Sequence, residues 1–145
     1  MTPARPVIGL GNEWRSDDGV GPEIARRLGG TVLSGEPIGV VEALEGLDEV
    51  VLVDAVSSGA PAGTVHVFDA SAEPLPVSVF GAASTHTLGL AEAVELARTL
   101  GRLPRRVLVY GIEGAGFDFG EGLSPEVEAA ADRVVEEVSA CTSGI

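Results

Sequence analysis

The chain has 145 residues, enough for one domain with a buried core, and 45% of them are hydrophobic, which is ordinary for a globular protein. Its formal net charge is −13 and all nine basic residues are arginines, which argues against a nucleic acid partner because so acidic a chain repels phosphate backbones. No apolar run approaches the ~18 residues that span a membrane. No secretory signal is evident and the single cysteine, Cys141, excludes an internal disulfide, so we expect a cytoplasmic protein without membrane contact.

Apolar runs and helical periodicities alternate along the chain. Short or continuous apolar runs predict strands at 7–8, 31–33, 50–53, 64–68 and 106–112. Apolar residues at helical spacing predict helices after the Asp17–Asp18 pair and at 37–47, 86–100 and 125–140. Segment 69–85 has no periodicity and is predicted as a long irregular loop. This alternation predicts an α/β fold with a mostly parallel sheet covered by helices on both faces.

The first strand leads into an unusual stretch, VIGLGNEWRSDDGVG, at residues 7–21. A strand, a glycine turn and an acidic helix start are how α/β proteins build sites at the carboxyl ends of their strands. The stretch does not match a dinucleotide-binding fingerprint, because Trp14 stands where the third glycine should be. One carboxylate of the Asp17–Asp18 pair is expected to cap the following helix. Since a cap needs only one carboxylate, the second is available for a functional site.

Three polar residues follow predicted strands or open a predicted helix. Asp18 follows the first strand's turn, Asp54 ends the apolar run VVLV, and His86 opens the helix after the irregular segment. Because the carboxyl ends of parallel strands meet at one edge of a sheet, these residues can converge there around a shared hollow. Two carboxylates and one imidazole form a plausible ligand set for a transition metal. The alternatives are that Asp54 caps a loop and that His86 is a surface residue.

The remaining candidate residues favour structural interpretations. His66 alternates with Val65 and Val67 in a strand and is expected to point away from their face and be exposed. Cys141 has no His or Asp neighbour in sequence, so we treat it as incidental. Three aromatic residues border glycine-rich loops and either form an apolar wall around a cleft or, as we expect, pack in the ordinary way: Trp14, Phe117 and Phe119.

Four segments, in this order, resemble the hydrogenase maturation endopeptidases, the processing proteases of nickel-iron hydrogenase large subunits (peptidase family M52). They are GLGNEWRSDDGVG, LVDAVSSGAPAGT, STHTLGL and YGIEGAGFDFGEGLSPEVEAA, and together they span nearly the whole chain. Region 31–49 is shorter than this family's pattern, and SGEP at 34–37 replaces its usual acidic-Gly-Gly-Thr segment. The resemblance implies one protease domain over residues 1–145, with a three-layer, mixed but mostly parallel twisted sheet of phosphorylase/hydrolase-like type.

The resemblance also implies an activity and its residues. Members of this family remove a C-terminal extension from the precursor of the hydrogenase large subunit once nickel has been inserted. Their metal-contacting acid, aspartate and histidine correspond to Asp18, Asp54 and His86, whereas Asp17 matches a neighbouring acidic position. We therefore expect these three residues to be both catalytic and metal-binding, with nickel carried by the substrate, no permanently bound cofactor, and a monomeric enzyme.

Two mechanisms stay open: the nickel, or a carboxylate acting as general base, helps water attack the amide. No Ser-His-Asp or Cys-His arrangement and no H-E-x-x-H zinc helix is evident. One alternative is a non-catalytic module that binds a metal or a partner during hydrogenase assembly. The other is a peptidyl-tRNA hydrolase-like enzyme, because GLGN resembles that opening, but no histidine precedes His66 and the charge is acidic.

Overall fold

The fold is a three-layer α/β sandwich. The computed structural model describes the chain at residues 5–80 and 85–143, with side chains described at 5–80 and 89–140. In chain order the elements are β1 (Val7–Leu10), η1 (Ser16–Gly19, a 3-10 helix), α1 (Val20–Arg27), β2 (Thr31–Leu33), α2 (Pro37–Leu44), β3 (Glu49–Val56), β4 (Val65–Asp69), α3 (Val77–Phe80), α4 (Thr85–Thr99), β5 (Arg106–Glu113) and α5 (Pro125–Ser143). No helix among the described residues is long and apolar enough to cross a membrane.

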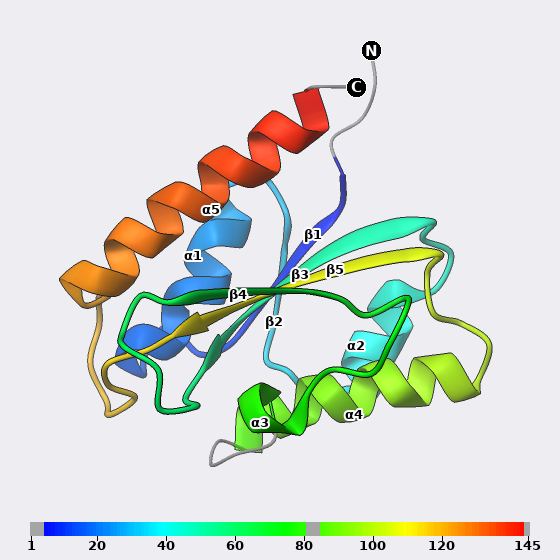
Figure 1. The fold of residues 1–145 in the computed structure, drawn as a ribbon, viewed down its shortest axis with the longest axis horizontal. Coiled ribbons are helices and arrows are strands. Elements are labelled where there is room, and N and C mark those ends of the chain that lie inside the picture. Colours follow the sequence, from blue (N-terminus) through cyan, green and yellow to red (C-terminus); the bar gives the residue numbers. More distant parts are fainter. Residues whose placement is uncertain (1–4, 81–84, 144–145) are drawn as a thin grey trace.

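The five strands form one sheet in the order β2-β1-β3-β5-β4. Strands β2, β1, β3 and β5 run parallel, whereas the edge strand β4 is antiparallel to β5. Helices α1 and α5 cover one face, and α2, α3 and α4 cover the other, as Figure 1 shows. The predicted mixed, mostly parallel sheet with helices on both faces is thereby confirmed.

Two apolar cores, one on each face of the sheet, hold the three layers together. Alternate residues of β3 point to opposite faces, so Leu52 and Val56 pack with α2 and α4, while Val51 and Val53 pack with α1 and α5. Each of these side chains is fully buried, which stabilises the fold by roughly 1.5–3 kcal/mol per residue. A strand buried on both faces needs apolar residues at every position, which is why VVLV is continuous.

Several predicted boundaries differ from the observed ones. The strand predicted at 50–53 runs on to Val56, because Ala55 and Val56 pair with Ile112 and Glu113 of β5. The helix predicted to reach residue 47 ends at Leu44. Helix α3, only 4 residues long, lies within the segment predicted to be irregular. The final helix extends to Ser143, slightly beyond the predicted end.

The start of α1 packs directly against the backbone of two strands, β1 and β3. A Cβ atom placed on Gly21 would lie 2.4 Å from the Leu10 carbonyl oxygen and 2.7 Å from that of Val53. A Cβ atom on Gly9 would lie 2.0 Å from the Gly21 carbonyl oxygen. The absence of side chains at Gly9 and Gly21 therefore lets the start of α1 lie directly against β1 and β3.

Gly9→Ala should destabilise the protein by about 3 kcal/mol, because the new methyl group forces apart backbone that cannot yield locally. Gly39→Ala is the matched control: this residue lies in α2 and has open space around its Cβ position. It should stabilise the fold by about 0.5–1 kcal/mol through helix propensity. Urea unfolding of both variants measures the difference, and equal stabilities would contradict the close approach.

Candidate functional site

The structure brings Asp18 and Asp54 together at the carboxyl edge of the sheet. Asp18 belongs to η1, directly after the turn that follows β1, and Asp54 lies in β3. Asp54 does not end its strand as predicted, because two more residues of β3 follow it. The two carboxylates are close enough that the charge of Asp18 contributes to raising the pKa of Asp54. The predicted convergence of these two acids is therefore present.

Both carboxylates are almost fully buried, with exposed fractions of 2% for Asp18 and 1% for Asp54. This differs from the open hollow expected from the sequence. The main-chain N–H of Asn12 donates a 2.9 Å hydrogen bond to Oδ2 of Asp18, and the N–H of Ala55 donates one of 2.8 Å to Oδ1 of Asp54. Oδ2 of Asp54 is buried, and no group among the described residues forms a hydrogen bond with it. In the described part of the chain, one oxygen of the pair thus lacks a donor.

The electrostatics of Asp54 follow from this arrangement. Burial raises its pKa well above the ordinary aspartate value, the nearby charge of Asp18 raises it further, and the hydrogen bond from Ala55 lowers it. The charged form of Asp54 is therefore disfavoured unless a cation lies beside it. Two buried carboxylates, one with an oxygen that has no partner in the described part of the chain, are a donor set that suits a divalent metal ion.

The third predicted ligand, His86, lies in the first turn of α4, which begins at Thr85, one residue before the predicted start. Its side chain lies outside the described residues, as do the side chains of Thr85 and Cys141. Among the side chains that are described, no group of three His, Cys, Asp or Glu residues is arranged to hold a metal. The structure thus describes two members of the proposed set.

Asp17 performs a different task from Asp18. Its Oδ2 accepts hydrogen bonds from the N–H groups of Ala115 (2.6 Å) and Gly116 (3.2 Å) and from Oγ of Ser124 (2.9 Å). Its Oδ1 accepts the N–H of Ser124 at 2.7 Å. The predicted helix cap is absent, since neither η1 nor α1 has a side-chain cap. Asp17 instead joins η1 to the loop before α5.

Further contacts hold the same two segments side by side. Oγ of Ser16 donates to the Asp118 carbonyl at 2.8 Å, and the Ser16 N–H donates to the Gly120 carbonyl, also at 2.8 Å. The N–H of Gly120 donates to the Trp14 carbonyl at 2.9 Å. Segments 14–18 and 114–124 therefore act as one unit, and the position of Asp18 depends on a loop about a hundred residues away in sequence.

His66 was predicted to be exposed, and this is wrong. Its side chain is only 20% exposed, and Nε2 lies 3.0 Å from Oε2 of the buried Glu113. The ring stacks on Phe68 with centroids 6.2 Å apart. The alternation of β4 correctly predicted its face, but not that a buried acid lies there. Glu113 was missed, although a glutamate directly after an apolar run was a usable signal.

The aromatic residues near the glycine-rich loops behave differently from one another. Phe117 packs against the core beneath α5, as expected for ordinary packing. Trp14 and Phe119 are 56% and 87% exposed. Trp14 lines an open groove of about 340 Å³ with Pro22, Val32 and others, and this groove includes Asn12, whose N–H binds Asp18. An apolar groove thus adjoins the acidic turn.

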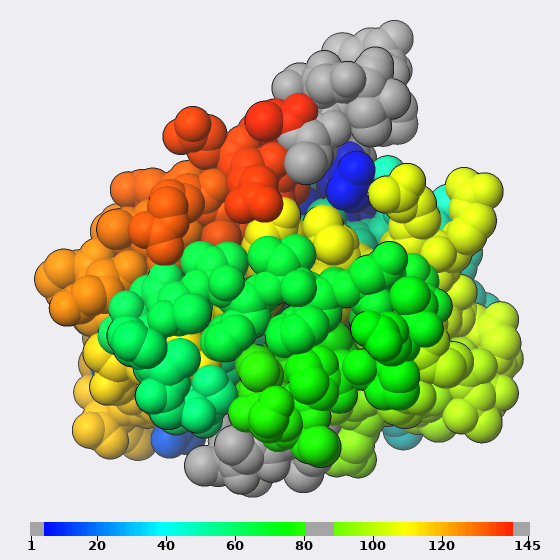
Figure 2. Space-filling view, viewed as in Figure 1, coloured from blue at the N-terminus to red at the C-terminus, as the bar shows by residue number. Residues whose placement is uncertain are grey.

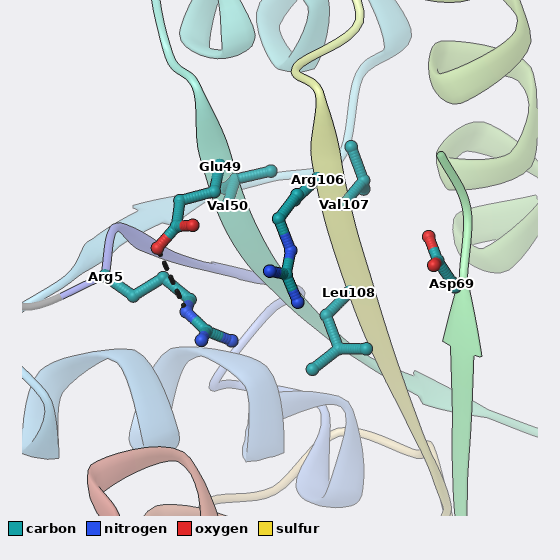
Figure 3. Close-up of a pocket in the computed structure, with 7 residues that line it drawn as sticks. All are labelled: Arg5, Glu49, Val50, Asp69, Arg106, Val107 and Leu108. Carbon is teal, nitrogen blue, oxygen red and sulfur yellow. Dashed lines mark ion pairs between the residues drawn. The ribbon is translucent and has the colours of Figure 1, made fainter. Parts of the chain in front are cut away.

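A small cavity lies at the opposite end of the strands. Figure 3 shows its lining residues, among them Arg5 and Glu49, whose ion pair measures 3.3 Å. Glu49 and Arg106 begin β3 and β5, so the cavity is at the amino edge of the parallel strands, away from Asp54. Its volume is about 40 Å³, little more than one water molecule occupies. This cavity is therefore too small to compete as a substrate site.

Asp17→Asn should destabilise the fold by roughly 3 kcal/mol. Both oxygens of Asp17 accept hydrogen bonds, whereas the amide of Asn has only one oxygen. Its NH2 group would therefore face main-chain N–H groups, which would be left without an acceptor. Thermal unfolding of the variant measures the loss. Asp118→Asn is the control: this side chain is exposed on the same loop, so its change should stay within about 0.5 kcal/mol.

Asp54→Asn should stabilise the protein at pH 7 by about 1 kcal/mol or more, because it removes a buried, poorly partnered charge. The pKa of Asp54 is raised in the folded state. Below the ordinary aspartate pKa, Asp54 is protonated in both the folded and the unfolded wild type and does not destabilise the fold. As pH rises above that value, the wild type loses stability. The advantage of the variant should therefore shrink towards pH 4. Urea unfolding between pH 4 and pH 8 measures this trend, and an advantage that grows at low pH would contradict it.

Comparison with known proteins identifies the relatives of this chain. The family model described as HycI, hydrogenase maturation protease, matches residues 29–141, a range that includes Asp54 and His86 and begins after Asp18. The Hydrogenase 2 maturation protease of Escherichia coli (strain K12) is 25% identical over 146 residues, which cover 92% of this chain and 87% of the relative.

Solved structures agree with this relationship. The [NiFe] hydrogenase maturation protease HybD from Thermococcus kodakarensis is 26% identical, with a TM-score of 0.74 over 97% of this chain and 99% of its own. The hydrogenase maturating endopeptidase HybD from Escherichia coli shares the fold, with 23% identity, a TM-score of 0.77, and coverage of 98% and 94%. Because the family model covers most of the sequence, the chain belongs to the hydrogenase maturation protease family and is an endopeptidase.

Proposed function

We propose that this endopeptidase removes the C-terminal extension of a nickel-iron hydrogenase large-subunit precursor after nickel has been inserted. In this proposal Asp18, Asp54 and His86 bind the nickel that the precursor carries and so test whether insertion has taken place. The observation that carries the proposal is the buried carboxylate pair, in which Oδ2 of Asp54 has no hydrogen-bond partner among the described residues. A cation delivered by the substrate would supply the missing partner.

The chemistry of the pair supports recognition of a substrate-borne ion. Without a cation, burial and the charge of Asp18 favour a protonated Asp54. A divalent ion reverses this preference, so Asp54 gives up its proton as the ion binds. The pair therefore responds to the metal by changing its own charge, which a surface carboxylate would not do.

Cleavage then requires water to add to the carbonyl carbon of the scissile amide. The carbon–nitrogen bond breaks, the proton of water reaches the departing amine, and a new carboxylate remains on the mature subunit. Either the nickel polarises the reacting groups or one of the two carboxylates accepts the proton of water. Both routes place the reaction at the carboxyl edge of the sheet.

The test is cleavage of a nickel-loaded and a nickel-free precursor, followed by mass spectrometry of the product. The wild type should shorten only the loaded precursor. Asp18→Ala, Asp54→Ala and His86→Ala should each lower the rate by about 100-fold or more. Glu136→Ala, an exposed position on α5, should keep the wild-type rate.

Two outcomes would overturn separate parts of the proposal. If all three variants cleave as fast as the wild type, these residues are not the site. If the nickel-free precursor is cleaved equally well, the enzyme does not test for the metal.

A further inference from the structure

A further buried acid, Glu113, lies at the same edge of the sheet and has no part in the proposed metal site. Glu113 ends β5 and is only 1% exposed. Its carboxylate accepts hydrogen bonds from the N–H of Ser58, at 3.1 Å to Oε1 and 3.3 Å to Oε2, and from Oγ of Ser58. Oε2 also lies 3.0 Å from Nε2 of His66. Three groups from two other segments thus converge on one side chain.

This cluster lies on the same face of the sheet as Asp54. In the sheet Asp54 is opposite Gly111 of β5, and Gly111 is opposite His66 of β4, so these three positions form a row across neighbouring strands. Glu113 shares their face because side chains alternate along β5. Two strand spacings, about 10 Å, separate the backbones of Asp54 and His66. Gly111 lies between them in this row, and the side chains of Phe80 and Val56 pack over it.

Glu113 also holds the loop that leaves β3 after Asp54. Its carbonyl oxygen accepts the N–H of Gly63 at 2.8 Å, and its N–H donates to the Thr64 carbonyl at 2.9 Å. Together with the bonds to Ser58, these contacts fix both ends of the loop at 57–64. Figure 2 shows this loop, in blue-green, at the surface beside the yellow-orange segment 114–124. Glu113 therefore determines the position of the loop at 57–64, at the edge of the sheet that carries Asp18 and Asp54.

Both carboxylate oxygens of Glu113 take part in this arrangement. Among the described residues its one ionisable partner is His66, and its remaining donors are neutral. A glutamine of the same shape has a single oxygen and would leave some of these donors without an acceptor. A buried carboxylate is unfavourable unless several donors satisfy it. The contacts with Ser58 and His66 therefore stabilise Glu113 at this position.

We propose that Glu113 is a positioning residue that acts through Ser58 and His66. It holds the loop at 57–64 in the shape that binds the precursor protein next to the scissile bond. This inference rests on the proposed function, because the loop lies at the edge that carries Asp54. Glu113 does not touch the reacting atoms, so its loss weakens precursor binding more than it slows the chemical step.

The first test measures kcat and KM for cleavage of the nickel-loaded precursor. Glu113→Ala and Ser58→Ala should raise KM about 10-fold and change kcat by less than about 3-fold, because they loosen the loop and leave the carboxylate pair in place. Glu113→Gln should fall between Glu113→Ala and the wild type, because it keeps the shape and one acceptor. Glu136→Ala, exposed on α5, is the matched control and should match the wild type.

Other patterns would overturn the proposal. A KM equal to the wild-type value in both Glu113→Ala and Ser58→Ala contradicts it, and so does a fall in kcat at unchanged KM. Circular dichroism and thermal unfolding identify any variant that fails to fold. In that event Ser58→Ala, the smallest change, decides the question.

A second test separates this inference from the proposed activity. Binding of the nickel-loaded precursor is measured by calorimetry for Asp54→Asn and for Asp54→Asn combined with Ser58→Ala, since neither should cleave it. If the double variant binds the precursor more weakly than Asp54→Asn, the positioning role is supported, even if the wild type cleaves nothing. If the wild type fails to cleave the precursor, only the proposed function is overturned. Equal affinities overturn the positioning role.

Discussion

The fold and the candidate site both depend on the hydrogen bonds that Asp17 accepts from residues 115–124. Four donors meet one buried carboxylate, and all of them lie about a hundred residues further along the chain. This interaction fixes η1 and therefore fixes Asp18, its immediate neighbour. The close approach of Gly21 to the Val53 carbonyl then places η1 beside the strand that carries Asp54. A site at the sheet edge is thus held by contacts outside the sheet.

The buried acids differ mainly in how well their oxygens are satisfied. In the part of the chain whose side chains are described, the buried charged residues are all carboxylates: Asp17, Asp18, Asp54 and Glu113. Asp17 has its four donors, and Glu113 has Ser58 and His66. Asp54 has one donor, and its Oδ2 has no partner among the described residues. Because an uncompensated buried charge is costly, this ranking singles out Asp54 as the residue that needs an additional ligand.

Much of the fold could be predicted because the local signals are strong. The continuous run VVLV is typical of a strand buried on both faces, and Ser124-Pro125 marks the start of α5. The segment at 69–85 was harder, because α3 has only 4 residues and too few positions to show a helical period. The end of β3 was also missed, since pairing with β5 extends it past the apolar run.

The site was predictable only in part, for a physical reason. Asp18 follows one parallel strand and Asp54 lies near the carboxyl end of another, and the rule that such strand ends meet brings the two to one edge. The partners of Asp17 and Glu113 come from distant segments, and no local pattern indicates which donors will reach a carboxylate. His66 illustrates the same limit of sequence periodicity, because alternation gives the face of a strand but not what the neighbouring strand places there.

The long sequence separation of the Asp17 contacts also affects how the newly made protein matures. Ser124 follows Asp17 by 107 positions, and a ribosome that adds about 5–20 residues per second needs roughly 5–20 s to make the intervening chain. Throughout that time the Asp17 carboxylate has none of its eventual donors. The nascent polypeptide therefore emerges with its acidic turn unfixed, and the peptidase becomes competent only after residues 115–124 have been made.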